Sequence, residues 1–221
     1  SLELFETFVE CGGSRIVGLG SCAEYDWNQG ICTEHETPCR PTTPYGEAKL
    51  AAGRYLDQLG RQGISTAWTR LFFMYGPGAS IDRMPGSVIS AISRGEPALC
   101  STGEQRRDFL YIQDVARAIV AILESGATGP INVCSGSAIS IASMAEQAAR
   151  LMDGESLLRL GALPTRPNDP ALIEGNNVRL IQEVGWRPRF SLAEGLQATI
   201  SAWSSHDAST QGVDLAKSGA S

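Results

Sequence analysis

The sequence predicts an α/β fold in which a parallel sheet carries helices on its faces. Two observations lead to this prediction: short apolar runs have the length of buried strands, and segments with helical periodicity alternate with them along the chain. Such alternation is typical of strand–helix–strand units. A chain of 221 residues that is 43% hydrophobic can bury a sizeable core.

The first third of the chain predicts two strands, each preceded by a helix. Gly12-Gly13 can end the first helix, and the turn YGPG (75–78) ends the second strand. The apolar side of the second helix carries Leu50, Leu56 and Leu59. In order, the elements are a helix over 2–11, a strand over 15–21, a helix from Tyr45 to about Gly60 and a strand over 65–73.

The remainder of the chain predicts shorter elements. The capping box SLAE (191–194) opens a last helix. From Ser204 on, the chain is rich in Ser, Ala and Gly without periodicity, which predicts a disordered tail. The elements between are a helix over about 86–94, a short strand over 98–100, extended chain over 106–112, a helix capped by Asp114, a strand over 131–135 and a helix over 143–152.

Composition limits the classes of partner and ligand. The net charge of −6 gives no basic field to attract nucleic acid or an anionic membrane. No apolar run reaches the roughly 18 residues of a membrane-spanning helix. The six cysteines form no C-x-x-C pair and only two histidines occur, which argues against zinc and any other metal. Scattered cysteines indicate buried thiols in a reducing cytoplasm.

Tyr45 and Lys49 in TPYGEAK (43–49) lie one helical turn apart. An ammonium beside a phenol stabilises the phenolate, so the pair can act as a general acid or base. The spacing alone favours the other interpretation, an interfacial Tyr and a solvated Lys. Ser21 ends the preceding strand, at the edge of a parallel sheet where ligands bind. Ser21, or Cys22 beside it, can therefore meet Tyr45 at one substrate oxygen, unless it is a loop hydroxyl satisfied by its surroundings.

Seven segments in fixed order carry a resemblance to a known family: GSCAEY, TPYGEAK, RLFFMYGPG, RRDFLYIQDVARAI, INVCSGS, RPNDP and GWRPRFSLAEGL. The series resembles the extended short-chain dehydrogenase/reductase family, the NAD-dependent epimerases and dehydratases that act on nucleotide sugars. The resemblance covers residues 1 to about 203. It implies the C-terminal part of a Rossmann-type doubly wound parallel sheet plus a small α/β substrate-binding region.

The resemblance also implies a division of the chain. Residues 1–78 would be the remaining Rossmann part. Residues 79–203 would be mainly the substrate-binding region, with a returning Rossmann strand and helix. Residues 204–221 would be the disordered tail.

For catalysis, the resemblance implies that Tyr45 is the acid/base and that Ser21 donates a hydrogen bond to the reacting substrate oxygen. In dehydratase-like members a Glu follows the hydroxyl residue by two, which aligns Glu24 with Cys22. Cys22 and Glu24 are therefore possible catalytic residues, and the choice between Ser21 and Cys22 stays open. A thiol donates a weaker hydrogen bond, which favours Ser21.

For the cofactor, NAD or NADP, the resemblance implies contacts from Tyr45 and Lys49. Lys49 would hold the ribose hydroxyls of the nicotinamide half and stabilise the phenolate of Tyr45. Tyr75 and Gly76 in the YGPG turn would lie beside the nicotinamide.

For the nucleotide-sugar substrate, the resemblance implies that Arg107 and Arg166 grip the diphosphate and nucleoside, with Arg83 as a lesser candidate. A planar guanidinium suits a phosphate because it can donate two parallel hydrogen bonds. The alternative is that Arg107 and Arg166 are surface cations or partners of Asp108 and Asp169.

Two departures from the family pattern limit these implications. Phe73 stands where many epimerases have Asn, which weakens a 4-epimerase assignment and leaves room for a keto-sugar reductase. The dinucleotide fingerprint G-x-x-G-x-x-G is absent from the chain. We therefore expect the N-terminal dinucleotide-binding βαβ units to be absent and the chain alone to be inactive.

The sequence thus predicts an NAD(P)-dependent epimerase, dehydratase or reductase of a nucleotide-activated sugar, homodimeric as the intact parent enzyme. The alternative is a non-catalytic nucleotide-binding relative or an inactive fragment. Retention of Ser21, Tyr45 and Lys49 together favours the enzyme, because a binding protein does not need the acid/base pair.

Overall fold

The computed structural model of the protein describes residues 2–203, and the predicted tail from Ser204 lies outside them. The chain forms two compact units. The first unit comprises the chain up to Met74, Gln105–Ile139 and Pro170–Arg189. The second comprises Tyr75–Glu104, Ser140–Asp169 and residues 190–203. No helix of the described residues is long and apolar enough to cross a membrane.

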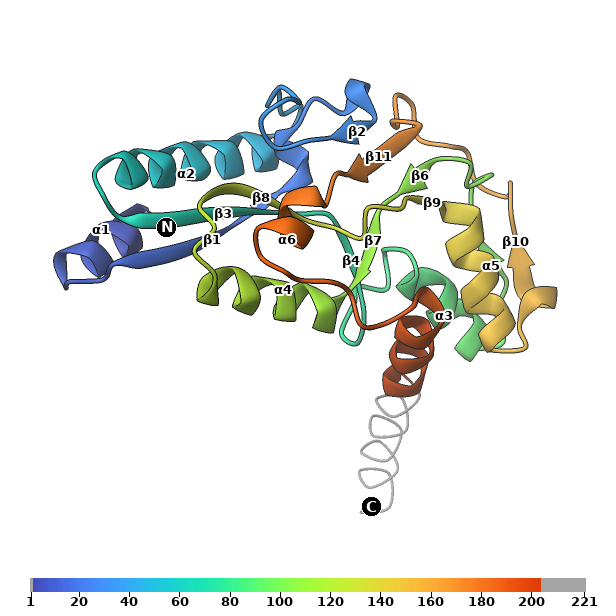
Figure 1. The fold of residues 1–221 in the computed structure, drawn as a ribbon. Helices are drawn as coiled ribbons and strands as arrows, with labels where there is room; N and C mark the ends of the chain where they lie inside the picture. Colours follow the sequence, from blue (N-terminus) through green and yellow to red (C-terminus); the bar gives the residue numbers. More distant parts are fainter. Residues whose placement is uncertain (1, 204–221) are drawn as a thin grey trace, which may run out of the picture. The chain divides into compact units, whose positions relative to one another are not determined.

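The core of the first unit is a parallel sheet with strand order β1-β3-β8. Figure 1 shows helix α2 on one face of this sheet and helix α4 on the other. In register, Arg15 pairs with Ser65 and Ser21 with Leu71 along the β1–β3 ladder. The elements are β1 (Arg15–Ser21), α2 (Pro44–Arg61), β3 (Ser65–Leu71), α4 (Ile112–Glu124) and β8 (Gly129–Val133).

Alternating side chains of the strands explain why both faces are covered. On the α2 side, Ile16 and Trp68 pack with Leu56 and Leu59, and helix α1 (Leu2–Glu10) adds Phe5 and Val9 to this cluster. On the α4 side, apolar residues of all three strands pack with the helix: Val17, Ala67, Leu71, Val115, Ala118, Ile122, Ile131 and Val133. Period-two alternation thus gives each face of the sheet its own apolar cluster, one under α2 and one under α4.

Smaller elements of the first unit surround the carboxyl ends of these strands. Strand β11 pairs in parallel with β2 and with β6, and β4 pairs with β7. Strand β9 (Ile139–Ser140) has its first residue in the first unit and its second residue in the second. The remaining elements are η1 (Cys22–Glu24), η2 (Trp27–Gln29), β2 (Ile31–Cys32), β4 (Phe73–Tyr75), β6 (Arg106–Arg107), β7 (Phe109–Tyr111), β11 (Leu172–Gly175) and α6 (Val178–Gln182).

The second unit packs helices α3 (Gly86–Ser93) and α5 (Ile141–Leu151) against each other. Strands β5 (Ala98–Leu99) and β10 (Leu158–Arg159) pair in parallel, and η3 (Glu155–Leu157) precedes β10. Residues 192–203 are helical. The capping box is present, because Ser191 N donates to Glu194 Oε2 at 2.8 Å and Glu194 N donates to Ser191 Oγ at 3.3 Å.

Most of the predicted elements are confirmed, with two corrections. Asp114 does not cap α4, which begins at Ile112 after Tyr111. The Asp114 carboxylate is instead fully buried in the first turn, where it pairs with Arg117 and accepts from Arg189 N at 3.0 Å. The strand predicted over 65–73 ends at Leu71, and β4 begins as a new strand in another sheet.

All six cysteines are free, and the prediction of buried thiols is confirmed for four of them. Cys22, Cys32 and Cys134 share one cluster with Tyr25, Phe72 and Ile173. Cys100 is also buried, Cys39 is half-buried, and Cys11 is exposed.

The buried thiols predict an alkaline limit to stability. Burial raises the pKa of Cys32 from 9.0 to about 12, although nearby Arg70 opposes the shift. Above pH 9 the unfolded chain loses this proton while the folded protein keeps it, so the stabilisation is present below pH 9 and is lost as the pH rises toward 12. One such thiol lowers the free energy of unfolding by up to about 1.4 kcal/mol per pH unit.

Urea denaturation at a series of alkaline pH values measures this slope. Cys32→Ala should make the fall shallower, whereas the matched variant Cys11→Ala at the exposed site should leave it unchanged. Equal slopes in the two variants would contradict the assignment.

Candidate functional site

The turn that follows β1 carries the first candidate residue. Ser21 is the last residue of the strand and the N-cap of η1. Its hydroxyl accepts from Ala23 N at 3.2 Å, and its own N–H donates to Glu24 Oε1 at 2.8 Å. These two bonds form a capping box around a single short turn, and they fix the backbone on both sides of the serine hydroxyl.

The start of α2 carries the second and third candidates. Thr43 caps the helix by accepting from Gly46 N at 3.1 Å, and Pro44 stands at the first helical position. Tyr45 follows with 57% of its surface exposed. Lys49 Nζ lies 5.8 Å from the centroid of the Tyr45 ring and donates to Leu19 O at 2.8 Å. The ammonium is thereby held between the phenol and the end of β1.

Gly46 lets these two segments approach each other. A Cβ at this position would lie 2.4 Å from the carbonyl oxygen of Ala23 in η1, and 2.9 Å from Cβ of Pro41. Only a glycine therefore allows the first turn of α2 to pack on the turn of Ser21. As a result, the structure places Ser21, Tyr45 and Lys49 on neighbouring segments at the carboxyl end of β1.

Cys22 and Glu24 are both buried. The thiol of Cys22 belongs to the apolar cluster beneath the turn, where burial first and Cys32 second raise its pKa well above the ordinary value. Glu24 is fully buried; Arg70 Nε donates to its Oε2 at 2.9 Å, and Trp68 Nε1 donates to its Oε1 at 2.9 Å. The surroundings of Cys22 and Glu24 are those of interior groups, whereas Tyr45 faces solvent.

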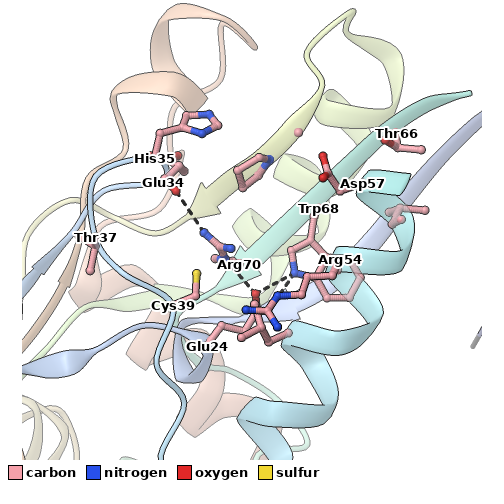
Figure 2. Close-up of a pocket in the computed structure, with 15 residues that line it drawn as sticks. Glu24, Glu34, His35, Thr37, Cys39, Arg54, Asp57, Thr66, Trp68 and Arg70 are labelled. Atoms are coloured by element: carbon pink, nitrogen blue, oxygen red, sulfur yellow. Dashed lines mark hydrogen bonds and ion pairs between the residues drawn. The ribbon is translucent and has the colours of Figure 1, made fainter. Parts of the chain in front are cut away.

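A cavity of about 430 Å³ opens on the α2 side of the first unit (Figure 2). Arg70 lies between Glu24 and Glu34 at its wall, and the ring of Trp68 and the side chain of Arg54 lie near the pair. Glu24 is the one predicted site residue that lines it; Ser21, Tyr45 and Lys49 do not. The cavity is therefore lined by Glu24, Trp68 and Arg70, the buried residues that contact the turn of Ser21, and not by the candidate catalytic residues themselves.

Sequence reasoning missed the residues around Glu24. Arg70 stands within a strand whose other residues are apolar or small, and it is 7% exposed. A charge in such a strand has to be paired when it is buried, which is a signal that the sequence carries. The sequence does not show which acidic residue pairs with Arg70.

Arg107 is buried and does not behave as a surface cation. Its Nη1 donates to the carbonyl oxygens of Arg106 at 2.8 Å and of Pro170 at 2.7 Å. The guanidinium lies 5.7 Å from the ring centroid of Phe73, the position at which an Asn was expected from the family pattern. Phe73 therefore makes a cation–π contact with the guanidinium of Arg107.

The other predicted binding residues belong to the second unit. Tyr75 is buried, and its hydroxyl donates to Leu192 O at 3.4 Å. Arg83 and Arg166 are both exposed. Arg166 opens a turn in which its carbonyl oxygen accepts from Asp169 N at 3.3 Å. Gly76 follows directly on Tyr75.

The family model described as the NAD dependent epimerase/dehydratase family matches residues 1–134. The chain belongs to this family. A UDP-glucuronic acid decarboxylase of Arabidopsis thaliana is 29% identical over 156 residues, which cover 69% of this chain and 45% of the relative. A GDP-6-deoxy-D-mannose reductase of Pseudomonas aeruginosa is 30% identical over 176 residues, which cover 75% and 57%. The chain thus spans about half the length of these curated relatives.

A solved structure of the same architecture is that of MoeE5 in complex with UDP-glucose and NAD. It is 30% identical and superposes with a TM-score of 0.81 over 93% of this chain and 70% of that chain. The similarity confirms the predicted Rossmann-type α/β fold, and the chain matches only part of the larger structure.

The residues at the end of β1 fit one end of a nicotinamide dinucleotide. Lys49 presents an ammonium that can hydrogen-bond ribose hydroxyls, beside the exposed phenol of Tyr45. The pyrophosphate end requires the N–H groups of a glycine-rich strand-to-helix turn, and the fingerprint for that turn is absent from these 221 residues. Between residues 2 and 203, no three His, Cys, Asp or Glu side chains are grouped as metal ligands.

Gly46→Ala tests the close approach at the start of α2. Alanine in a helix normally adds stability relative to glycine, by roughly 0.5–1 kcal/mol. Here the contact of 2.4 Å with a backbone oxygen should instead lower the free energy of unfolding by about 1–3 kcal/mol. Chemical denaturation measures the change.

Gly126→Ala is the matched control, because a Cβ there meets nothing within 4 Å. It should change the free energy of unfolding by less than about 0.5 kcal/mol. If the two variants were equally stable, the packing of the first turn of α2 on the turn of Ser21 would not depend on Gly46.

Proposed function

We propose that this chain carries the proton-transfer half of an NAD(P)-dependent enzyme that epimerises, dehydrates or reduces a nucleotide-activated sugar. The observation that carries the proposal is the exposed Tyr45 beside the ammonium of Lys49, on a helix start that packs through Gly46 on the turn of Ser21. Membership of the NAD dependent epimerase/dehydratase family supports it.

Each of the three residues has a role that follows from its position. Tyr45 moves a proton to or from the substrate oxygen, since the residue is exposed at the start of α2. Lys49 stabilises the phenolate that forms when the proton leaves. Ser21 donates a hydrogen bond to the same oxygen and holds it in place. The nicotinamide ring, when bound, supplies the acceptor or donor of a hydride.

Ser21 suits the hydrogen-bonding role better than Cys22 does. The serine hydroxyl belongs to the capped turn beside α2, whereas the thiol of Cys22 lies in the apolar cluster with Cys32 and Cys134. We therefore keep Ser21, Tyr45 and Lys49 as the proposed catalytic set and give Cys22 a packing role.

Substrate contacts are proposed for the arginines. Arg166 and Arg83 are exposed and able to meet a diphosphate. Arg107 is held by two backbone carbonyls, and we propose that its guanidinium meets the substrate diphosphate from this fixed position. Tyr75 and Gly76 remain proposed neighbours of the nicotinamide, and a homodimer remains the proposed assembly of the intact enzyme.

Tyr45→Phe should lower turnover of the enzyme that contains this chain by at least ~10²-fold, the usual contribution of general acid–base catalysis. The Michaelis constant for the nucleotide sugar should change little, because only a hydroxyl is removed. Steady-state kinetics with UDP-, GDP-, CDP- and dTDP-sugars and with NAD and NADP provide the measurement.

Tyr55→Phe is a matched control on the same helix. Its hydroxyl donates to Glu6 Oε1 at 2.5 Å, away from the candidate site, so turnover should stay at the wild-type level. A Tyr45→Phe enzyme within a few-fold of wild type would exclude Tyr45 as the acid/base.

A further inference from the structure

A buried network of charges and hydrogen bonds stands behind the turn of Ser21. Glu24 is at its centre and is fully buried. Its Oε1 accepts from Ser21 N at 2.8 Å and from Trp68 Nε1 at 2.9 Å. Its Oε2 accepts from Arg70 Nε at 2.9 Å. Both carboxylate oxygens are thus engaged by groups of the protein.

The carboxylate lies directly against strand β1. A Cβ on Gly20 would lie 2.4 Å from Glu24 Oε1 and 2.3 Å from Trp68 Nε1. Any side chain at position 20 would therefore push the carboxylate off the N–H of Ser21. Gly20, Glu24, Trp68 and Arg70 act as one structural unit that holds the end of the strand.

Arg70 extends this unit across the sheet. Its Nη1 donates to Tyr25 Oη at 2.9 Å and to Glu34 O at 3.4 Å, and its guanidinium lies 4.5 Å from the Tyr25 ring centroid. Tyr25 in turn donates to Asn132 Oδ1 at 2.8 Å, and Asn132 N donates to Glu34 Oε1 at 2.8 Å. The turn after β1 is therefore tied to β3 and β8.

A buried network of this kind fixes the positions of its members more than it raises the free energy of unfolding. Removing two charges from water costs about as much as their attraction returns, so a buried ion pair is weak evidence for added stability. A carboxylate whose acceptor sites are all occupied does fix the positions of its donors. The donor that matters here is the backbone N–H of Ser21.

We propose that Glu24 is a positioning residue: its ion pair with Arg70 and its hydrogen bond from Ser21 N hold the Ser21 hydroxyl in place beside Tyr45. The inference rests on the proposed function, and it differs from the direct catalytic role that the family resemblance left possible for Glu24. The carboxylate acts through Ser21 and exchanges no proton with substrate.

Glu24→Gln is the first test, because it keeps the volume of the side chain and one acceptor oxygen. The amide NH₂ group would face the donors of Arg70 or Trp68, so the ion pair is lost. We expect turnover to fall by about 10- to 100-fold, as for a small displacement of a catalytic group. The Michaelis constants for substrate and cofactor should stay within about threefold, because no binding group is removed.

The pH profile separates positioning from acid catalysis. If Glu24 only positions Ser21, the profile of Glu24→Gln keeps both limbs of the wild-type profile at a lower height. Loss of one limb would show that Glu24 itself exchanges a proton in the reaction, and this would overturn the proposal. Glu24→Asp, which keeps the charge, should recover part of the lost turnover.

Asp114→Asn is the matched control for stability. Asp114 is also fully buried and ion-paired, with Arg117, but it lies in α4. This variant should lower the unfolding temperature without lowering turnover. If Glu24→Gln and Asp114→Asn lost turnover equally, the loss in Glu24→Gln would be explained by general destabilisation of the fold. This result would overturn the proposal.

Amide hydrogen exchange at Ser21 tests the positioning role of Glu24 without substrate, and therefore independently of the proposed function. In nuclear magnetic resonance spectra of this chain, the Ser21 amide proton should be protected from exchange in the wild type and should exchange at least about tenfold faster in Glu24→Gln, because its acceptor is disturbed. Trp68→Phe, which removes one neutral donor and leaves the ion pair, should have a smaller effect. Unchanged Ser21 protection in a folded Glu24→Gln protein would overturn the proposal, even if no nucleotide sugar were turned over.

Discussion

The arrangement of the candidate site depends on one buried ion pair, that between Glu24 and Arg70. A single carboxylate in the interior is costly unless each oxygen receives donors. Here the donors come from three places in the sequence: the backbone of Ser21, the indole of Trp68 and the guanidinium of Arg70. Satisfying the charge therefore requires the turn after β1 to sit at one position on β3.

The second constraint is the contact between this turn and the start of α2. Gly46 removes the Cβ that would collide with Ala23 O, and Thr43 with Pro44 sets where the helix begins. Because the carboxylate of Glu24 accepts from the backbone N–H of Ser21 and holds the turn after β1, helix α2 packs on a fixed surface. The strand end with Ser21 and the helix start with Tyr45 thus lie on neighbouring segments, although 24 positions separate the two residues in the sequence. The carboxyl end of a parallel strand is where such convergence is expected.

Much of this arrangement follows from local patterns. The run RIVGLGS predicts β1 with its observed bounds, because a short apolar run of this length is typical of a strand in a parallel sheet. The i, i+4 spacing places Lys49 over the ring of Tyr45, because a helix fixes that distance. The prediction for Asp114 was wrong, although a carboxylate near the start of a helix is typical of an N-cap. In the structure, Asp114 is a buried partner of Arg117 in an ion pair.

The network around Glu24 could not be predicted because its members are distant in sequence. Arg70 and Glu24 are 46 residues apart, and Asn132 and Glu34 are 98 apart. Arg70 alone signals that some partner exists, because a buried strand does not carry an unpaired charge. Choosing Glu24 among the acidic residues requires the register of β1 on β3, which only the folded sheet supplies. The same holds for Arg107, whose backbone partner at Pro170 is 63 residues away.

A double-mutant cycle between Ser21→Ala and Glu24→Gln tests the central claim most directly. If Glu24 acts through Ser21, then Glu24→Gln lowers turnover in the wild-type background but has an additional effect of less than about threefold once the Ser21 hydroxyl is gone, since the two changes remove one shared interaction. Single-turnover rates in the enzyme that contains this chain give the four values of the cycle. Losses of turnover that multiply in the double variant would show that the two residues act independently, and would contradict the account.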